Sequence, residues 1–159
     1  MISKDIINQI VEKREYFEQK LLEFLLCDTM LFCSENEEIN NMYGKKISKV
    51  IDDFNKMLGV EYKLSRGFDI DEGNKKYQDV IGQYLSQSDG DFLGCIYMIA
   101  TELRSVMLAF LLMNKKISIN ESIELAFYEE CFQQKKWGSI QELEDKNKQI
   151  YHNINKMLE

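Results

Sequence analysis

The sequence contains no proline and a single histidine among its 159 residues. Proline is the strongest interrupter of helices, and isoleucine, lysine, asparagine, glutamate and leucine are abundant here, so the composition favours an all-helical fold. The histidine, His152, lies near the end of the chain in a charged segment. We expect its side chain to be solvated there rather than to act as a general base.

The motifs of common catalytic sites are also missing. The sequence has no glycine-rich phosphate loop, no Gly-x-Ser-x-Gly and no His-Glu-x-x-His. Neighbouring acids such as Asp52-Asp53 point about 100° apart on a helix and cannot converge on one substrate atom. We therefore predict a protein that is not an enzyme and has no catalytic, cofactor-binding or metal-binding residues. A small enzyme is a remote alternative, which a deep pocket with converging titratable groups would support.

The chain has no excess of basic residues. It carries 20 lysines and arginines against 27 acids, a net charge of −7. Nucleic-acid binding draws most of its affinity from neutralised phosphates, and anionic membrane surfaces also attract basic segments. Neither is an expected partner, which leaves another protein as the predicted binding partner.

Cysteine is present without any Cys-x-x-Cys spacing. The four residues, Cys27, Cys33, Cys95 and Cys131, are far apart in apolar surroundings. This pattern predicts reduced, buried thiols in a reducing cytoplasm. The first 15 residues, MISKDIINQIVEKRE, do not read as a signal peptide, because acidic and amide residues interrupt any apolar core region.

The most prominent feature that is present is the apolar run from Phe92 to Met113. A helix of this length spans roughly 33 Å, which suits either a membrane or the centre of a small domain. Glu102 and Arg104 lie near the middle of the run, and a charge at mid-bilayer costs on the order of 2.5–3.5 kcal/mol. We therefore predict a buried central helix over about 91–113 and no membrane insertion. Glu102, Arg104 and Ser105 are interpreted as a structural ion pair or the one exposed arc of this helix, with a binding role as the alternative.

Apolar residues at helical spacing predict further helices around this run. Their predicted limits are 4–27 with Ser3 as the cap, a helix from a Ser34–Glu37 capping box to Gly59, one over 77–85 after an exposed loop at 65–73, 119–137 between Ser118 and Gly138, and a last helix from a Ser139–Glu142 box to 158. Ser88 or Asp89 is expected to cap the central helix, and 60–64 could form a short extended segment. The prediction is an all-α fold of five or six helices around a central hydrophobic helix, in one domain over 1–159.

A series of motifs in the second half of the chain points to a family. The motif residues are Leu103, Ser105 and Leu108, then Ile117-Ser118, then Glu129, Glu130, Gln133, Trp137 and Gly138. Their order and spacing over some forty residues resemble the C-terminal domain of the ATP-twelve family. Those proteins are assembly chaperones for the alpha subunit of the F-type ATP synthase, found in mitochondria and alphaproteobacteria.

The resemblance extends upstream more weakly and has departures. Asp28, Thr29 and Phe32 resemble the family's Asp-Thr-x-x-Tyr segment, and Gly59-Val60-Glu61-Tyr62 its turn after the next helix. The family usually has arginine at Cys33, Trp-Asp-Pro at Lys46-Ile47-Ser48, and an acid at Gln141, where Glu142 lies beside it. Family members also carry a strand-rich N-terminal domain, which we expect to be absent from this chain.

The resemblance implies a cytoplasmic bacterial chaperone that binds the free alpha subunit and prevents its aggregation before the catalytic head assembles. By motif match, the candidate client-binding residues are Glu129, Gln133, Trp137 and Glu142. A structural alternative is that these residues only stabilise the junction of the last two helices, with Trp137 as a core or capping aromatic. The rival function is a degenerate helical interaction or regulatory module that has lost this client.

Overall fold

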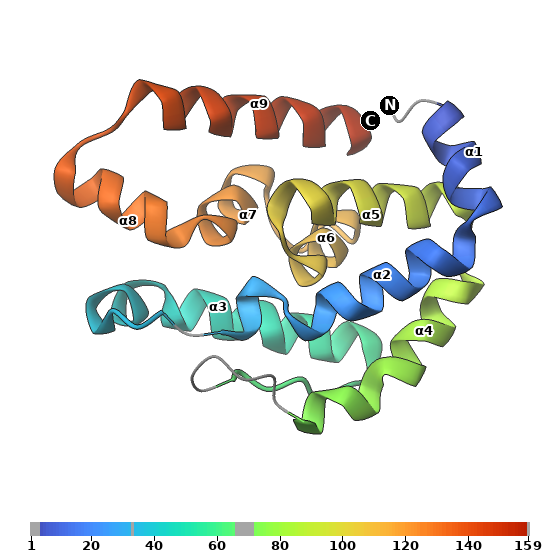
Figure 1. The fold of residues 1–159 in the computed structure, drawn as a ribbon. Helices are drawn as coiled ribbons and strands as arrows, with labels where there is room; N and C mark the ends of the chain where they lie inside the picture. The colour runs from blue at the N-terminus through green and yellow to red at the C-terminus, as the bar shows by residue number, and fades with distance from the viewer. Residues whose placement is uncertain (1–3, 33, 66–71, 159) are drawn as a thin grey trace.

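The computed structural model describes residues 4–32, 34–65 and 72–158, and within them the chain is helical with no strand (Figure 1). The α-helices are α1 (Lys4–Glu12), α2 (Arg14–Leu26), α3 (Glu37–Leu58), α4 (Gln78–Gln87), α5 (Gly90–Leu103), α6 (Val106–Met113), α7 (Ile119–Ala126), α8 (Tyr128–Trp137) and α9 (Gln141–Leu158). The described ranges also contain two 3-10 helices, η1 (Thr29–Leu31) and η2 (Glu72–Tyr77). The predicted all-α fold is confirmed.

The described residues form nine α-helices rather than five or six because three of the predicted helices are each split once. The helix predicted over 4–27 breaks at Lys13, and the one over 119–137 breaks at Phe127, whose φ is −120°. The central helix predicted over about 91–113 breaks at Arg104, which adopts a left-handed backbone with φ 56°. The apolar pattern continues through all three breaks, which is why the sequence did not reveal them.

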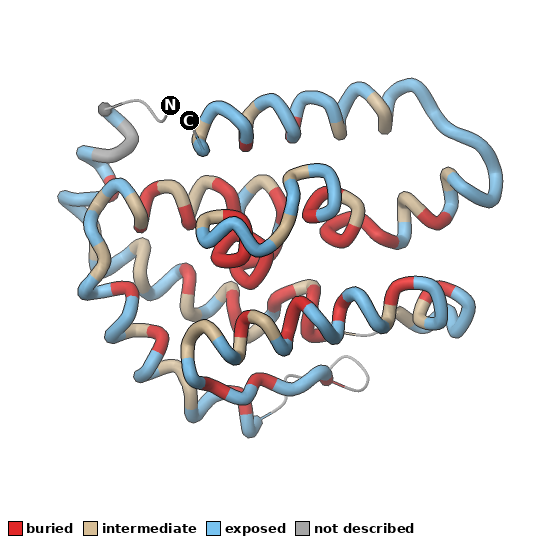
Figure 2. Tube along the Cα trace, turned by 180° about the vertical axis from the view of Figure 1, so that it is seen from behind, coloured by how far each residue is buried: buried red, intermediate tan, exposed pale blue. Residues whose placement is uncertain are grey.

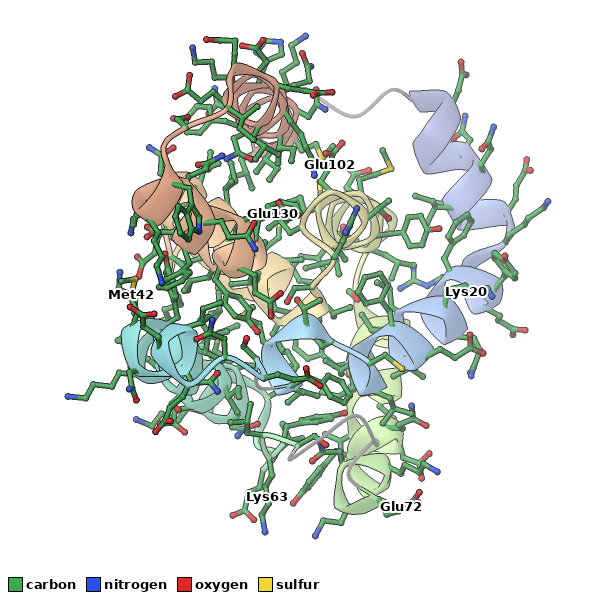
Figure 3. All side chains as sticks on the ribbon, turned by 60° about the vertical axis from the view of Figure 1, so that its left-hand side comes forward. Lys20, Met42, Lys63, Glu72, Glu102 and Glu130 are labelled. Atoms are coloured by element: carbon green, nitrogen blue, oxygen red, sulfur yellow. The ribbon has the colours of Figure 1, made fainter. Side chains whose placement is uncertain are left out.

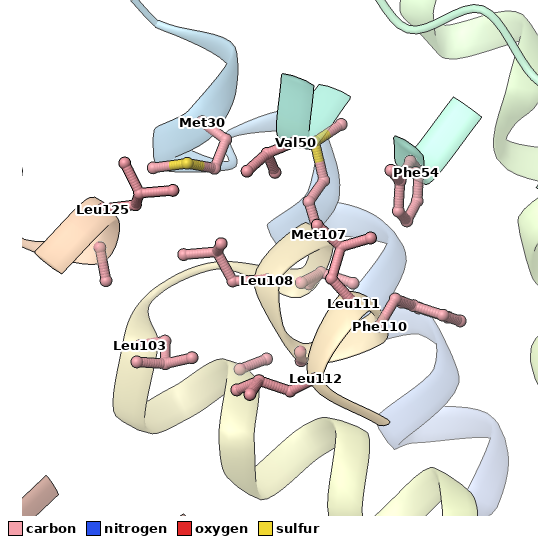
Figure 4. Close-up of a cluster of buried hydrophobic side chains, with 14 of the residues drawn as sticks. Met30, Val50, Phe54, Leu103, Met107, Leu108, Phe110, Leu111, Leu112 and Leu125 are labelled. Carbon is pink, nitrogen blue, oxygen red and sulfur yellow. The ribbon is translucent and has the colours of Figure 1, made fainter. Parts of the chain in front are cut away.

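The centre of the molecule is therefore a pair of helices, α5 and α6, packed against each other. All residues of α6 from 106 to 112 are buried. Figure 4 shows how side chains from η1, α3 and α7 meet those of α5 and α6 in one cluster. The buried side chains labelled there are Met30, Val50, Phe54, Leu103, Met107, Leu108, Phe110, Leu111, Leu112 and Leu125.

A buried carboxylate explains why α6 begins where it does. Asp28 is completely buried, and its Oδ2 accepts hydrogen bonds from the backbone N–H groups of Val106 (2.8 Å) and Met107 (3.0 Å). Its Oδ1 accepts from the Ser105 hydroxyl (2.7 Å) and the Met30 N–H (3.0 Å). A negative charge at a helix N-terminus is favourable, so Asp28 fixes the start of α6. Burial raises the pKa of this carboxyl to about 6, against the opposing effect of the hydrogen bonds.

The remaining helices surround this pair. Helix α9 packs on α5 and α7 along one edge of the molecule, and α3 packs on α6, α7 and α8 on the opposite side (Figure 1). In Figure 2 the buried residues face the centre, and α9 contributes few of them. The buried residues of α9 are Ile150 and Ile154. The last helix is therefore attached along a narrow stripe, and most of its surface faces solvent.

Four of the predicted helix ends are confirmed. The Asp89 carboxylate accepts from the Phe92 N–H (2.7 Å), and the Ser118 hydroxyl accepts from the Glu121 N–H (3.1 Å). Gly59 ends α3 with φ 66°, and Gly138 ends α8. These residue types supply a side-chain acceptor at a helix start or a left-handed backbone at a helix end.

Two predicted caps are wrong. Asn36 rather than Ser34 caps α3, because its side-chain oxygen accepts from the N–H groups of the first turn, and the Ser34 hydroxyl instead accepts from the Asn36 N–H (3.1 Å). The Ser139 hydroxyl pairs with the Glu144 carboxylate rather than forming a box with Glu142. At α3 the Asn36 side chain bonds the N–H groups of the first turn, whereas at α9 the backbone carbonyl of Ile140 accepts from the N–H groups of Leu143 and Glu144.

Other predictions differ in burial. Cys27 is exposed and Cys95 and Cys131 are partly exposed, so the prediction of buried thiols is wrong for Cys27. Ser65, predicted in an exposed loop, is buried and forms an isolated parallel bridge with Phe32. Residues 60–64 are neither helix nor strand.

Some predictions cannot be compared. Ser3, Cys33 and residues 66–71 lie outside the described residues. Within the described part of the chain, no helix is both long enough and apolar enough to cross a membrane, in line with the reading of the apolar run as a core element.

Candidate functional site

The candidate site is the corner between α8 and α9. Helix α8 ends at Gly138, whose N–H donates to the Gln134 carbonyl (2.9 Å) and whose backbone has φ 95° and ψ 159°. This combination is open almost only to glycine, because any Cβ would clash with the backbone. The chain reverses there, and α9 begins at Gln141.

Two large apolar side chains project into solvent at this corner. Trp137 is 79% exposed and Ile140 is 59% exposed, on either side of the turn. The interpretation of Trp137 as a core or capping aromatic is therefore wrong. The Lys136 ammonium lies 5.7 Å from the Trp137 ring centroid. Exposed apolar surface of this kind marks protein-interaction sites, and tryptophan is enriched among residues that dominate binding energy.

The structure places the four candidate residues on two elements. Glu129, Gln133 and Trp137 follow one another at intervals of four on α8, and all three are exposed, so they share one face of that helix. Glu142 is exposed in the first turn of α9, beyond the corner. Among the described residues, none of the four side chains has a hydrogen-bonding or ion-pair partner, which gives no support to a role in joining the two helices.

In the described part of the chain, two lysines of α8, and not the four candidate residues, form the polar contacts between this helix and its neighbours α3 and α7. The Lys135 ammonium lies 2.8 Å from the Glu124 carboxylate of α7, and its Nζ is 3.4 Å from the Tyr43 hydroxyl of α3. The hydrogen bond from Lys135 lowers the pKa of Glu124. The Lys136 ammonium pairs with Glu38 of α3 at 3.3 Å. These contacts anchor α8 while leaving its outer face free.

The charges at the corner are consequently unbalanced. Lys135 and Lys136 are neutralised by their carboxylate partners, whereas Glu129 and Glu142 lack such partners among the described residues. The corner presents an apolar tip with uncompensated negative charge beside it. A complementary surface would have an apolar recess with basic residues at its edge.

Sequence reasoning missed one member of this corner. Ile140 follows the Trp137-Gly138 break by two residues, where no helical pattern assigns it to a core face. The sequence feature that could have identified Ile140 as exposed is its position just after the end of a predicted helix. With Trp137 it forms what we call the apolar tip, defined by these two residues.

The polar patch of the apolar run is not a single site. Ser105 is buried as the cap of α6, and the Glu102 carboxylate accepts from the Asn153 amide of α9 (3.1 Å). Arg104 is exposed at the break between α5 and α6. The interpretation as an ion pair or an exposed arc is wrong for Ser105, which is buried and whose hydroxyl accepts from the Leu108 N–H in the first turn of α6.

Two hollows lie on the surface away from the corner between α8 and α9. A groove of about 720 Å³ runs along the outer side of α3, with Phe32, Ile47 and Leu64 among its lining residues. Another of about 600 Å³ lies between α7 and α9 and contains Cys131 and Tyr151. Within the described residues no group of three or more histidine, cysteine, aspartate or glutamate side chains could hold a metal ion. His152 is exposed, as predicted.

Comparison with known proteins identifies the fold. Atp12 from Paracoccus denitrificans, and a variant of it with one aspartate replaced by lysine, superpose with a TM-score of 0.86 at 14% identity, over 96% of this chain and 66% of theirs. A candidate chaperone from Agrobacterium tumefaciens superposes with a TM-score of 0.85 at 17% identity, over 96% of this chain and 58% of that one. No family model and no curated protein matches the sequence. The resemblance read from the motifs is confirmed at the level of the fold.

Proposed function

We propose that this protein is a chaperone that binds the free alpha subunit of the F-type ATP synthase and keeps it from aggregating before the catalytic head assembles. The observation that carries the proposal is the apolar tip, held in solvent on a fold shared with Atp12. A helical surface of this kind can shield a client without catalysis and release it when a better partner competes.

The client-binding face would consist of Glu129, Gln133 and Trp137 on α8, together with Glu142 on α9. Ile140 joins them because it shares the exposed corner with Trp137. The negative charge beside the tip favours a basic rim on the client and disfavours nucleic acid and anionic membranes, in keeping with the net charge of −7. A bacterial cytoplasm is the location that this function implies.

The solved neighbours are longer than this chain, which spans 66% of the Paracoccus protein. We propose that the part matched is the helical C-terminal domain of the family, so that residues 1–159 correspond to one domain. Client contacts made by other parts of the family's proteins are not assigned to this chain.

A degenerate interaction or regulatory module is the alternative function. It is motivated by the family residues that this sequence lacks, with Lys46-Ile47-Ser48 in place of Trp-Asp-Pro. Ile47 and Ser48 line the groove on α3, so any client contact at that groove would differ from the family's. The two functions predict different results in one experiment. A chaperone for the alpha subunit should recover that subunit from the native host, and a module that has lost this client should not.

The test is affinity capture of partners from the native host with the wild-type chain and a Trp137→Ala variant. The wild type should recover the ATP synthase alpha subunit, and the variant should recover at least tenfold less, because large exposed aromatics dominate interface energies. Tyr16→Ala is the matched control, since Tyr16 is an exposed aromatic on α2 with 56% exposure.

Stability measurements complete that experiment. Both substitutions remove side chains that face solvent, so each should change the free energy of unfolding by no more than about 0.5 kcal/mol. Recovery of no alpha subunit by the folded wild type would contradict the chaperone and favour the degenerate module. Equal recovery by wild type and Trp137→Ala would contradict the assignment of the corner.

A further inference from the structure

A third hollow, of about 400 Å³, lies where the end of α5, the junction of α7 and α8, and the middle of α9 meet. It is separate from the apolar tip, and six of its eight lining residues are polar or charged. Glu102 and Arg104 come from the end of α5, Phe127 from the junction, and Lys146 and Asn153 from α9. Figure 3 shows Glu102 in the space between α5 and α9.

Two cations from different elements converge on the Phe127 ring in this hollow. The Arg104 guanidinium carbon lies 5.8 Å from the ring centroid, and the Lys146 ammonium lies 4.7 Å from it. Phe127 itself is buried, so its ring forms the wall against which both charged groups rest. Cation–π contacts of this kind orient the two groups but leave their charge uncompensated.

Neither cation has an anionic partner in the described part of the chain. No carboxylate there lies within 4.0 Å of Arg104 or Lys146, in contrast to Lys135 and Lys136 on α8, which each pair with a glutamate. This is unexpected in a chain with a net charge of −7, where acids outnumber bases. An unpaired arginine and lysine at one hollow form a local positive site.

The one acid of the hollow is hydrogen-bonded to α9 rather than paired with either cation. The Glu102 carboxylate accepts from the Asn153 side-chain amide at 3.1 Å, and the Asn153 carbonyl oxygen accepts from the Gln149 amide at 3.0 Å. This chain of amides holds the Glu102 carboxylate toward α9. Two cations against one carboxylate leave a single positive charge in the hollow.

The backbone at Arg104 adds an independent observation. Its φ of 56° lies in the left-handed region, which a residue with a Cβ rarely adopts, and the Thr29 hydroxyl donates to its carbonyl (3.2 Å). Glycine or asparagine would satisfy this turn with less strain, so the turn alone does not account for arginine here. Strained residues of this kind concentrate where a side chain is needed for binding.

We infer that this hollow binds one carboxylate group, such as a glutamate side chain of a partner protein, between Arg104 and Lys146. The planar guanidinium matches a carboxylate through two parallel hydrogen bonds, and the ammonium supplies a second donor. One carboxylate neutralises the single net positive charge, whereas a phosphate dianion would exceed it. The inference is independent of the proposed client, because it rests only on the residues of this hollow.

The experiment is an NMR titration of the full chain with N-acetylglutamate methylamide, which carries one carboxylate. The Arg104 side-chain N–H and the backbone amides of Gln149 and Asn153 should shift saturably. The neutral glutamine analogue at the same concentrations should leave these resonances in place. Equal shifts with the glutamine analogue would overturn the inference, as would tighter binding of inorganic phosphate than of the glutamate probe.

Two pairs of variants distinguish the site from general electrostatics. Arg104→Gly and Lys146→Ala should each weaken probe binding at least tenfold, read from the α9 backbone amides. Lys115→Gly is the matched control for the first, since Lys115 also has a left-handed backbone (φ 58°) but does not line the hollow. Lys148→Ala is the control for the second, because Lys148 faces the hollow between α7 and α9. Unchanged affinity in both site variants, or equal losses in site and control variants, would refute the site.

Discussion

At the scale of single residues, the fold depends on a carboxylate that connects distant parts of the chain. Asp28 reaches from the end of α2 to the first turn of α6, 77 to 79 residues later in the sequence. It satisfies two backbone N–H groups that would otherwise be buried without partners, together with the Ser105 hydroxyl. The Asp28 and Ser105 positions, recognised from the sequence only as motif residues, thus have a structural reason.

The cap at Ser105 gives a direct test of this contact. Ser105→Ala should lower the free energy of unfolding by about 2–3 kcal/mol, because it removes a helix cap and one buried hydrogen bond to Asp28. Ser118→Ala should cost only about 1 kcal/mol, since Ser118 caps α7 at an exposed position. Chemical denaturation of both variants measures the difference, and equal losses would contradict the role of Asp28.

The titration of Asp28 predicts a pH dependence. Its pKa is about 6 in the folded protein, because burial disfavours the charge, against about 4 in an unfolded chain. Between these values the folded state holds a proton that the unfolded state lacks. The contribution of Asp28 to the free energy of unfolding therefore falls, by about 3 kcal/mol, as the pH rises from about 4 to about 6.

Carbon NMR of the Asp28 carboxyl group measures this titration. The midpoint should lie near pH 6 in the wild type. It should move upward in Ser105→Ala, because the lost hydrogen bond favours the ionised carboxylate. A wild-type midpoint at or below about pH 4 would contradict the account.

Residue-level prediction from the sequence succeeded where local chemistry decides. Ser118, Asp89 and Gly138 end or begin helices as predicted, because a cap needs only a polar acceptor or a glycine at the right offset. The exposure of Trp137 was not predictable in this way. Whether an aromatic at a helix end is covered depends on where the next helix goes, which the local sequence does not specify.

At the scale of elements, the three helix breaks carry most of the difference between prediction and structure. None of Lys13, Arg104 and Phe127 is a proline or glycine, so each break lies inside a run with continuing apolar periodicity. The break at Arg104 is stabilised by Asp28 and by the Thr29 hydroxyl, both remote in sequence. Tertiary contacts can override helix propensity, and single-sequence patterns do not record them.

The turn between α8 and α9 provides the prediction at this scale. Gly138→Ala should lower the free energy of unfolding by about 1–3 kcal/mol, since its backbone conformation is strained for any residue with a Cβ. Apart from Gly138 itself and its two chain neighbours, no atom of the described residues lies within 4 Å of the added methyl group, so the loss would come from local backbone strain alone. Weaker client binding should accompany it, because the turn positions the apolar tip.

Gly44→Ala is the matched control for that substitution. Gly44 lies within α3 with equally open space around an added Cβ. Alanine should raise the free energy of unfolding there by about 0.5–1 kcal/mol, through its higher helix propensity. Thermal unfolding of Gly138→Ala and Gly44→Ala measures both changes. A loss of stability of similar size in the two variants would show that the turn at Gly138 has no special conformation.

At the scale of the whole molecule, the helices form a buried centre and an outer surface that carries the two proposed contact sites. The pair α5 and α6 holds the core, as the apolar run predicted, and α9 attaches through only two buried residues. The apolar tip lies at the corner between α8 and α9. The hollow lined by Arg104 and Lys146, here called the positive hollow, lies where α9 meets the end of α5. Under the proposed function, these features of a predominantly acidic chain would hold a protein client by surface complementarity.

The sequence predicted this whole-molecule organisation through its composition and motifs. The absence of proline, the central apolar run and the Trp137-Gly138 break together define an all-α domain with a C-terminal helical corner. The positive hollow could not be predicted, because its residues meet only in the folded chain. Glu102 and Asn153, which are hydrogen-bonded to each other there, are 51 positions apart in the sequence. Motifs report local order, whereas binding surfaces depend on how remote elements pack.

Light scattering of purified ATP synthase alpha subunit, diluted from denaturant into buffer, tests the central claim most directly. An equimolar amount of the wild-type chain should suppress the rise in scattering, and Trp137→Ala should suppress it much less. Aggregation in the presence of the wild-type chain that proceeds as fast as with an unrelated acidic protein of the same size would contradict the proposed chaperone function.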